Sequence, residues 1–378
     1  MPSRRRGEPP KDMFEDAILG TIERLKPDID EDALRDLLVH TARATAESVV
    51  ENLHAATPAM LIDYAALRAG FEIRLRDPWG PAFDRYEVLV VAAREAGERF
   101  IERHAKEAGA ESDDGDPLFN ALARLHARAV RVADEVFSLL RSGHAGGAMA
   151  RWRTLHEIAV VMAFVAEHGR DLAERYLLHD AVASWRGLPD YQLFAEHLGD
   201  VPFTSEEVAQ MRAERDALIA RFGSPYGEEW GWAAEAVGKP RPAFRDIENA
   251  AELAHWRPYG RWASQNVHAG PRALFSVIGL DDDSDMLLAG ASNMGLADPG
   301  ANAAFSLALA TTELLATRAG IEELVSMQVV LTMNQEAGDA FIEAHEELER
   351  RIVEERRQRR KRRRRKRATP GPQRPEPT

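Results

Sequence analysis

The spacing of apolar residues constrains the fold of this chain more than any other feature of its sequence. Between residues 32 and 53, apolar side chains recur every three or four positions, at Leu34, Leu37, Leu38, Ala42, Ala46, Val49, Val50 and Leu53. That spacing places them on one face of an α-helix, and it returns in later segments as far as residue 355. Few segments alternate with the period of two that a half-buried strand requires, so the sequence predicts an all-α protein.

Turn signals divide this helical pattern into segments. Pro58 suits the first turn of a second helix that reaches about Leu75, and DPWGP at 77–81 is expected to break the chain before a third helix. Thr204 and Glu207 form a capping box, which marks the start of a helix that ends near residue 222. Other helices are expected over residues 86–101, 117–141, 148–167, 171–186, 245–267, 302–318 and most of 321–355.

The segment GAESDDGDP at 109–117 is acidic and ends in proline, so we interpret it as a linker between two domains. An N-terminal helical subdomain is expected over 11–110 and a helical core domain over 117–340. Residues 1–10 are polar and proline-bearing and are expected to be disordered. The predicted fold is an irregular helical bundle with an N-terminal helical subdomain and a disordered basic C-terminal tail.

The tail is predicted over 356–378, because its sequence is too highly charged to fold. The chain has a net charge of −13, and without the eleven basic residues of RRQRRKRRRRKR at 356–367 it would have −24. The body should therefore repel nucleic acid and the tail attract it, unless the tail binds an acidic protein surface or the acidic segment 343–355. The predicted nucleic-acid-binding residues are Arg356, Arg357, Arg359, Arg360, Lys361, Arg362, Arg363, Arg364, Arg365, Lys366 and Arg367.

Several classes of protein are excluded by the composition. The chain has no cysteine, so it has no disulfide framework and no thiolate site. It has no apolar run of about 18 residues and no apolar signal core at its N-terminus, so we expect a cytoplasmic protein without a membrane partner. Glu-x-x-His pairs at 51–54 and 252–255 are no more frequent than chance and fall in different predicted domains, so no metal or cofactor is predicted. The sequence leaves open whether the protein forms a homo-oligomer.

One group of candidate site residues lies on the helix over 148–167. Arg153 and Glu157 are four residues apart and share a helix face. They form either a local salt bridge at the edge of the core or part of a ligand or catalytic site. His156 is a weaker member of the same group.

A second group lies over 259–268. Ser264 and His268 share a face, and Tyr259 is offset from it. Gly270 and Pro271 stop the helix, so His268 either satisfies the last carbonyls or transfers protons beside Tyr259 and Ser264.

A third group, comprising Ser292, Asn293 and Asp298, lies in the loop GASNMGLADPG at 290–300. The side chains of these residues either hydrogen-bond to the nearby backbone and stabilise turns, or bind a ligand. No lysine follows the glycines and no strand clearly precedes them, which excludes a P-loop and a dinucleotide fingerprint.

The segments 150–165 and 261–309 resemble a bacterial family known as domain of unknown function 5677. The resemblance rests on the Arg153–Glu157 pair, on the Tyr259, Ser264 and His268 stretch, and on the loop from Gly290 to Pro299. It covers about residues 120–310. The family has no established activity, so the resemblance implies a helical fold and leaves the function open.

Two functional hypotheses follow. The first is a helical binding or interaction module whose basic tail attracts RNA or DNA. The alternative is a metal-independent ribonuclease of the HEPN type, in which histidine transfers protons and arginine stabilises the phosphate charge. The Arg-x4–6-His spacing of that class occurs at Arg151–His156 and Arg261–His268, although chance also produces such pairs. The catalytic candidates are therefore His268, Arg261, His156, Arg153 and Glu157, and whether the protein is an enzyme stays open.

Overall fold

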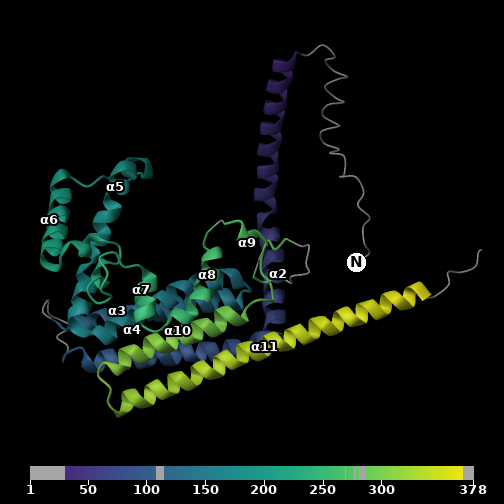
Figure 1. The fold of residues 1–378 in the computed structure, drawn as a ribbon. Helices are drawn as coiled ribbons and strands as arrows, with labels where there is room; N and C mark the ends of the chain where they lie inside the picture. The colour runs from purple at the N-terminus through teal and green to yellow at the C-terminus, as the bar shows by residue number, and fades with distance from the viewer. Residues whose placement is uncertain (1–29, 108–114, 269, 276–277, 281–286, 369–378) are drawn as a thin grey trace, which may run out of the picture. The chain divides into compact units, whose positions relative to one another are not determined.

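The structure is a computed structural model that describes residues 30–107, 115–268, 270–275, 278–280 and 287–368. All regular structure in these ranges is helical, so the all-α prediction is confirmed (Figure 1). None of the described helices is long and apolar enough to cross a membrane. The α-helices are α2 (Glu31–His104), α3 (Pro117–Arg141), α4 (Ala145–Leu178), α5 (Asp180–Leu198), α6 (Ser205–Phe222), α7 (Phe244–Ala250), α8 (Arg257–Gln265), α9 (Arg272–Phe275), α10 (Ala297–Ala316) and α11 (Ile321–Ala368). The 3₁₀ helices are η1 (Ser224–Gly227), η2 (Gly231–Ala233) and η3 (Ala254–Trp256).

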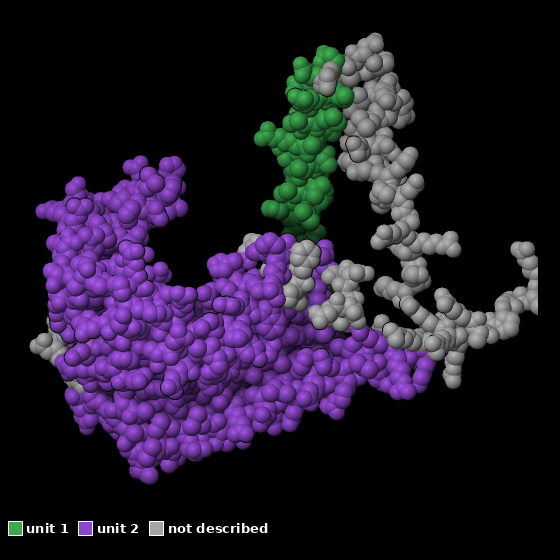
Figure 2. Space-filling view, in the orientation of Figure 1, with its two compact units in different colours: residues 1–70 green, residues 71–378 purple. Residues whose placement is uncertain are grey.

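The chain divides into two compact units, residues 1–70 and residues 71–378 (Figure 2). This division differs from the domain boundary that the sequence suggested at 109–117. Residues 71–104 of α2 belong to the larger unit, where Leu75, Trp79 and Phe83 are buried. The apolar pattern identified the helix and its buried face, but it contained no information about which helices would cover that face.

The predicted break at 77–81 is wrong, because α2 is helical throughout this segment. Trp79 is fully buried there, and its indole N–H donates a hydrogen bond of 2.9 Å to the backbone oxygen of Asn293. Pro78 and Pro81 in this segment remove backbone donors, and tertiary packing of this kind compensates for their cost.

The core of the larger unit is formed by α3, α4, α10 and α11 with residues 71–104 of α2. Phe341 of α11 lies at the centre of an aromatic group, with its ring centroid 6.2 Å from those of Trp79 and Tyr86 and 6.3 Å from that of Phe83. Gly300 of α10 packs against the same ring, since a Cβ there would lie 2.4 Å from Phe341 Cζ. The absence of a side chain at 300 allows α10 and α11 to approach closely.

Local signals in the sequence explain several helix ends. The capping box is confirmed: the Thr204 N–H donates to Glu207 Oε2 at 2.8 Å, and the Glu207 N–H donates to Thr204 Oγ1 at 3.3 Å. Gly169, with φ of 74°, forms the kink within α4 between the two helices expected at 148–167 and 171–186. The single helix expected over 245–267 is wrong. Instead, α7, η3 and α8 follow one another, and Glu252 between α7 and η3 has a φ of 57°.

The tail that the sequence predicts to be disordered, residues 356–378, is described only in its first part. Residues 356–368 form the last turns of α11, while residues 369–378 lie outside the described residues, as do residues 1–10. Arginine and lysine have high helix propensity, so a helix that is already formed extends readily through them.

Candidate functional site

The N-terminal half of α4 presents a row of large and polar side chains to α10 and α8. Trp152 is fully buried there. Its indole N–H lies 3.0 Å from the backbone oxygen of Asn302 and 3.0 Å from Ser306 Oγ, both on α10. These hydrogen bonds hold the start of α4 against α10 and determine where the neighbouring residues of α4 point.

One turn after Trp152, His156 meets a buried ion pair from α7 and α8. His156 Nε2 lies 3.5 Å from Glu248 Oε1, and the Arg257 Nε–H donates to Glu248 Oε2 at 2.7 Å. His156 and Glu248 are only 2% and 3% exposed. Burial alone would raise the pKa of Glu248, but His156 and Arg257 beside it lower that pKa below its usual value. A histidine held by a carboxylate is an arrangement used for proton transfer, yet this one is sealed from solvent.

Aromatic rings surround the His156 side of this cluster. The Trp256 centroid lies 6.3 Å from His156, 5.8 Å from Tyr259 and 4.5 Å from the stacked ring of Phe305. Buried polar atoms without a hydrogen-bonding partner in the described protein occur here too, at His156 Nδ1, Trp256 Nε1, Gln265 Oε1 and Asn302 Nδ2. Polar atoms are therefore buried among these aromatic rings.

The structure brings together two residues that the sequence placed in separate candidate groups. The Arg153 guanidinium donates a hydrogen bond of 3.1 Å to Ser264 Oγ on α8. Arg153 thus bonds across to a neighbouring helix. Burial raises the pKa of Glu157, and the charges of Arg153, Arg128 and His156 partly oppose that shift. Together these contacts link the two segments, 150–157 and 259–264, that contain most of the candidate residues.

The two Arg-x4–6-His motifs have different environments in the structure. Arg151 forms an ion pair with Glu135 of α3, while His156 faces Glu248 of α7. Arg261 and His268 are both exposed, and His268 lies in the turn that ends α8, where its N–H donates to the backbone oxygen of Ser264. The arginine and histidine of the first motif thus contact different partners.

The loop over 290–300 is held by contacts within the protein. Ser292 Oγ donates to the Gly279 oxygen at 2.6 Å, and the Ser292 N–H donates to the Gly143 oxygen at 2.9 Å. The Asn293 backbone oxygen accepts the bond from Trp79, and Asp298 lies in the first turn of α10. Burial raises the pKa of Asp298, and His345 partly opposes that shift. These contacts favour the structural interpretation of this loop.

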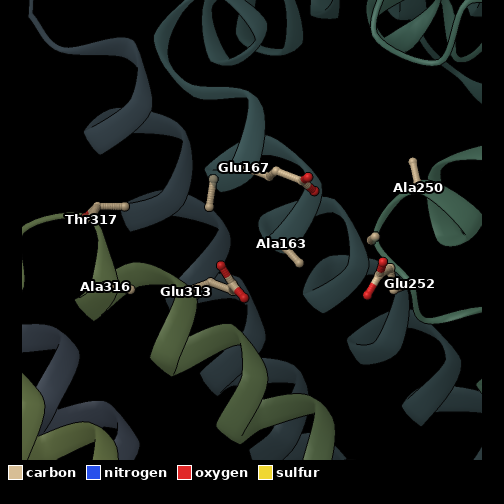
Figure 3. Close-up of a pocket in the computed structure, with 9 residues that line it drawn as sticks. Ala163, Glu167, Ala250, Glu252, Glu313, Ala316 and Thr317 are labelled. Carbon is tan, nitrogen blue, oxygen red and sulfur yellow. The ribbon is translucent and has the colours of Figure 1, made fainter.

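A pocket that the sequence did not suggest lies between α4, α10 and the turn after α7. It has a volume of about 540 Å³, and three glutamates stand on its walls among small residues (Figure 3). Burial and the nearby charge of Glu167 raise the pKa of Glu313. The described residues contain no group of three or more histidines or acidic residues arranged to hold a metal ion. The lining residues are Ala163, Ala166, Glu167, Ala250, Ala251, Glu252, Glu313, Ala316 and Thr317.

Comparison with known proteins yields one family. Residues 119–285 match a family model described as a family of unknown function (DUF5677). The matched range contains Arg153, His156, Glu248 and Ser264, but it ends before the loop over 290–300. Neither the comparison with curated proteins nor the comparison with solved structures found a match.

Proposed function

We propose a function from the chain's own features, because the family model that matches residues 119–285 (DUF5677) describes a family of unknown function and supplies no activity. The protein is a nucleic-acid-binding protein, and its contact element is the basic end of α11. The single observation that supports this function best is that a packed helix continues, without a break, through a run of eleven basic residues.

The first part of α11 is anchored in the larger unit. Val330, Phe341 and Leu348 are buried there, and Arg351 forms an ion pair with Asp77 of α2. After Ile352, every side chain whose exposure is described is exposed. Figure 1 shows this C-terminal end of α11, in yellow, extending past the other helices of the same unit. The basic run therefore continues a helix whose earlier part is held in the larger unit.

Charge density gives this element its affinity for phosphate. The residues 356–367 occupy about 18 Å of helix at 1.5 Å per residue. Eleven positive charges over that length repel one another, and binding a phosphate backbone relieves this repulsion and releases counterions. A helix about 10–12 Å in diameter also fits the major groove of a DNA duplex. The charge of the remaining chain, −24, confines the contact to the tail.

The acidic residues just before the basic run are partly paired within α11. Glu347 accepts from Arg351 at 2.9 Å and lies 3.1 Å from Arg350, and Glu354 lies 4.0 Å from Arg357. These pairs are mainly with arginines at 350–357, which precede most of the run. These acidic residues therefore neutralise part of the charge at the beginning of the basic run.

The ribonuclease alternative has less support from the geometry. Its proton-transfer candidate His156 is 2% exposed, and the arginine of its motif pairs with Glu135. His268 is exposed. The test is to incubate labelled RNA with the protein and with its His156→Gln and His268→Gln variants. Cleavage by the unsubstituted protein that either substitution abolishes would support the ribonuclease alternative.

The proposed function is tested by titrating the full chain into a labelled 20-base-pair duplex and measuring fluorescence anisotropy across a salt series. A chain ending at Glu355 should lose binding, whereas a control chain ending at Arg367 should bind like the full chain. If six to eight phosphates are contacted, the slope of log K against log salt should be about −5 to −7 for DNA. Unchanged binding by the chain ending at Glu355 would refute the proposal.

A further inference from the structure

Residues 32–70 of α2 form a helical stretch that has no buried side chain. From Asp32 to Gly70 every residue is exposed or half-buried. This includes many large apolar residues, with exposed fractions from 37% at Leu38 to 70% at Ile62. The exposed large apolar residues of this stretch are Leu37, Leu38, Val39, Val49, Val50, Leu53, Met60, Leu61, Ile62, Tyr64 and Leu67.

Most of these apolar residues lie along one side of the helix. Leu38, Val49 and Met60 are eleven residues apart, and eleven residues make three turns, so the three side chains lie on one line parallel to the helix axis. Leu53 and Tyr64 share the same spacing on a neighbouring line. Leu37 and Ile62 are the exceptions: Ile62 follows Met60 by two residues, or about 200°, and points away, and Leu37 lies within about 20° of Ile62 around the helix. We call the side that contains Leu38, Val49, Leu53, Met60 and Tyr64 the α2 stripe.

We propose that the α2 stripe is a dimerisation surface that pairs with the same stripe of a second copy of this chain. A helix with so much exposed apolar surface gains little stability by itself, and Pro58 in its interior weakens it further. Pairing along the stripe removes these side chains from water. The stripe from Leu38 to Tyr64 is about 39 Å long, and covering it buries several hundred Å² per copy, on the order of the ~800 Å² that stable interfaces use.

The regular period of the stripe favours an identical partner. A second copy presents apolar residues with the same eleven-residue period over the same length, so each apolar layer meets another along the whole helix. Two-fold pairing of identical surfaces is also the commonest way in which chains assemble. An eleven-residue period keeps the stripe nearly straight along the axis, so the two helices can remain in contact without a strong supercoil.

The charges of residues 31–70 disfavour other partners. A helix that lies on an anionic membrane carries lysine and arginine on its polar face, and a nucleic-acid partner requires the same charges. Here the acidic residues outnumber the basic ones and include Glu47 and Glu51 on the side opposite the stripe. The acidic residues are Glu31, Asp32, Asp36, Glu47, Glu51 and Asp63, and the basic residues are Arg35, Arg43 and Arg68.

The test compares two matched substitutions in the full chain by sedimentation equilibrium. Met60→Glu places a charge in the stripe, and Ile62→Glu makes a similar change of chemistry two residues away, on the opposite side. Glutamate suits a helix, and circular dichroism checks that both variants keep their helix content. The unsubstituted chain should dimerise at micromolar concentration. Met60→Glu should weaken the dimer about 100-fold, because each copy would bury a charge in an apolar interface, and Ile62→Glu should change it less than about threefold.

A cross-link gives an independent readout, because the chain has no cysteine of its own. Leu53 lies close to the midpoint of the stripe, so copies paired in either direction bring the two Leu53 positions together. A Leu53→Cys chain should form a disulfide-linked dimer on mild oxidation, and an Ile62→Cys chain should not.

Several results would overturn the proposal. They are a full chain that stays monomeric at 100 μM, a dimer that Met60→Glu leaves unchanged, and a dimer that both glutamate variants weaken equally. A full chain that is monomeric and dimerises only after removal of residues 1–29 would instead identify that segment as the cover of the stripe.

Discussion

The two parts of α2 carry similar apolar patterns and have opposite environments. Over 71–104 the apolar residues are buried in the larger unit, where Trp79, Phe83 and Tyr86 surround Phe341 of α11. Over 31–70 the equivalent residues are exposed. An amphipathic pattern therefore specifies a helix and the face that needs covering. Whether that face stabilises the fold depends on a partner, which residues 71–104 find among the described residues of the chain and residues 32–70 do not.

The largest change in stability is expected when one large side chain is removed from residues 71–104 and, for comparison, one from residues 31–70. Trp79→Ala should lower the free energy of unfolding of the larger unit by about 3–5 kcal/mol, since it leaves a cavity and removes the bond to Asn293. Met60→Ala should leave that free energy unchanged within about 0.5 kcal/mol. Urea denaturation followed by tryptophan fluorescence measures both. Equal losses would mean that residues 31–70 are part of the same packed core.

A smaller effect is expected where α2 crosses α3. A Cβ at Gly97 would lie 2.2 Å from Cε1 of His126, which is buried and lies 3.1 Å from Thr311 Oγ1. Gly97→Ala should therefore destabilise the larger unit by about 2–3 kcal/mol, although alanine favours helix, because the imidazole must move away from Thr311. Thermal denaturation compares the Gly97→Ala variant with Ser48→Ala in the exposed part of α2, where no loss of stability is expected. A gain of stability in Gly97→Ala would show that the two helices are not in close contact.

Burial of His126 also makes the stability of the larger unit depend on pH. Burial lowers the pKa of His126 to about 4, while in the unfolded chain the histidine titrates near 6.5. Between these two pKa values the histidine of the unfolded chain is protonated, whereas His126 in the folded protein stays neutral. The stability contribution is complete above about pH 6.5 and is lost as the pH falls towards 4.

This loss should amount to about 2 kcal/mol between pH 7 and pH 5. Urea denaturation at the two pH values measures it, and a His126→Gln variant, which lacks the titrating group, should show a correspondingly smaller pH dependence. The same pH dependence in both proteins would argue against a buried neutral histidine at this crossing.

The smallest effect is expected for an ion pair in the exposed part of α2. Arg43 and Glu47 lie 4.0 Å apart and are 81% and 72% exposed, so Glu47→Gln should change stability by less than about 0.5 kcal/mol. In the larger unit, Glu323 is buried and accepts hydrogen bonds from Arg103 and from the Gly320 N–H. Glu323→Gln should therefore lower the melting temperature measurably, and Glu47→Gln should not. A larger effect at Glu47 would show that residues 31–70 pack more tightly than their exposure indicates.

Part of the candidate site was accessible from the sequence. The spacing of Arg153 and Glu157, and that of Tyr259 and Ser264, pointed to two helices whose polar residues required partners. The structure joins the two groups through the bond from Arg153 to Ser264. Glu248, which faces His156, and Arg257, which donates to Glu248, were missed because no short motif marks them. The alanine-lined pocket was missed for a similar reason, since its walls come from three separate segments.

Local physical chemistry in the sequence determined the helical class, the apolar faces, the capping box at Thr204 and the basic run at 356–367. These features depend on neighbours within a few residues, so spacing and residue type are enough to reveal them. Tertiary structure alone decided that α2 continues through Pro78 and Pro81, that its second part is buried while its first is exposed, and that His156 meets Glu248. Each of these depends on a residue more than ten positions distant, and the packing of whole helices decides which distant residues meet.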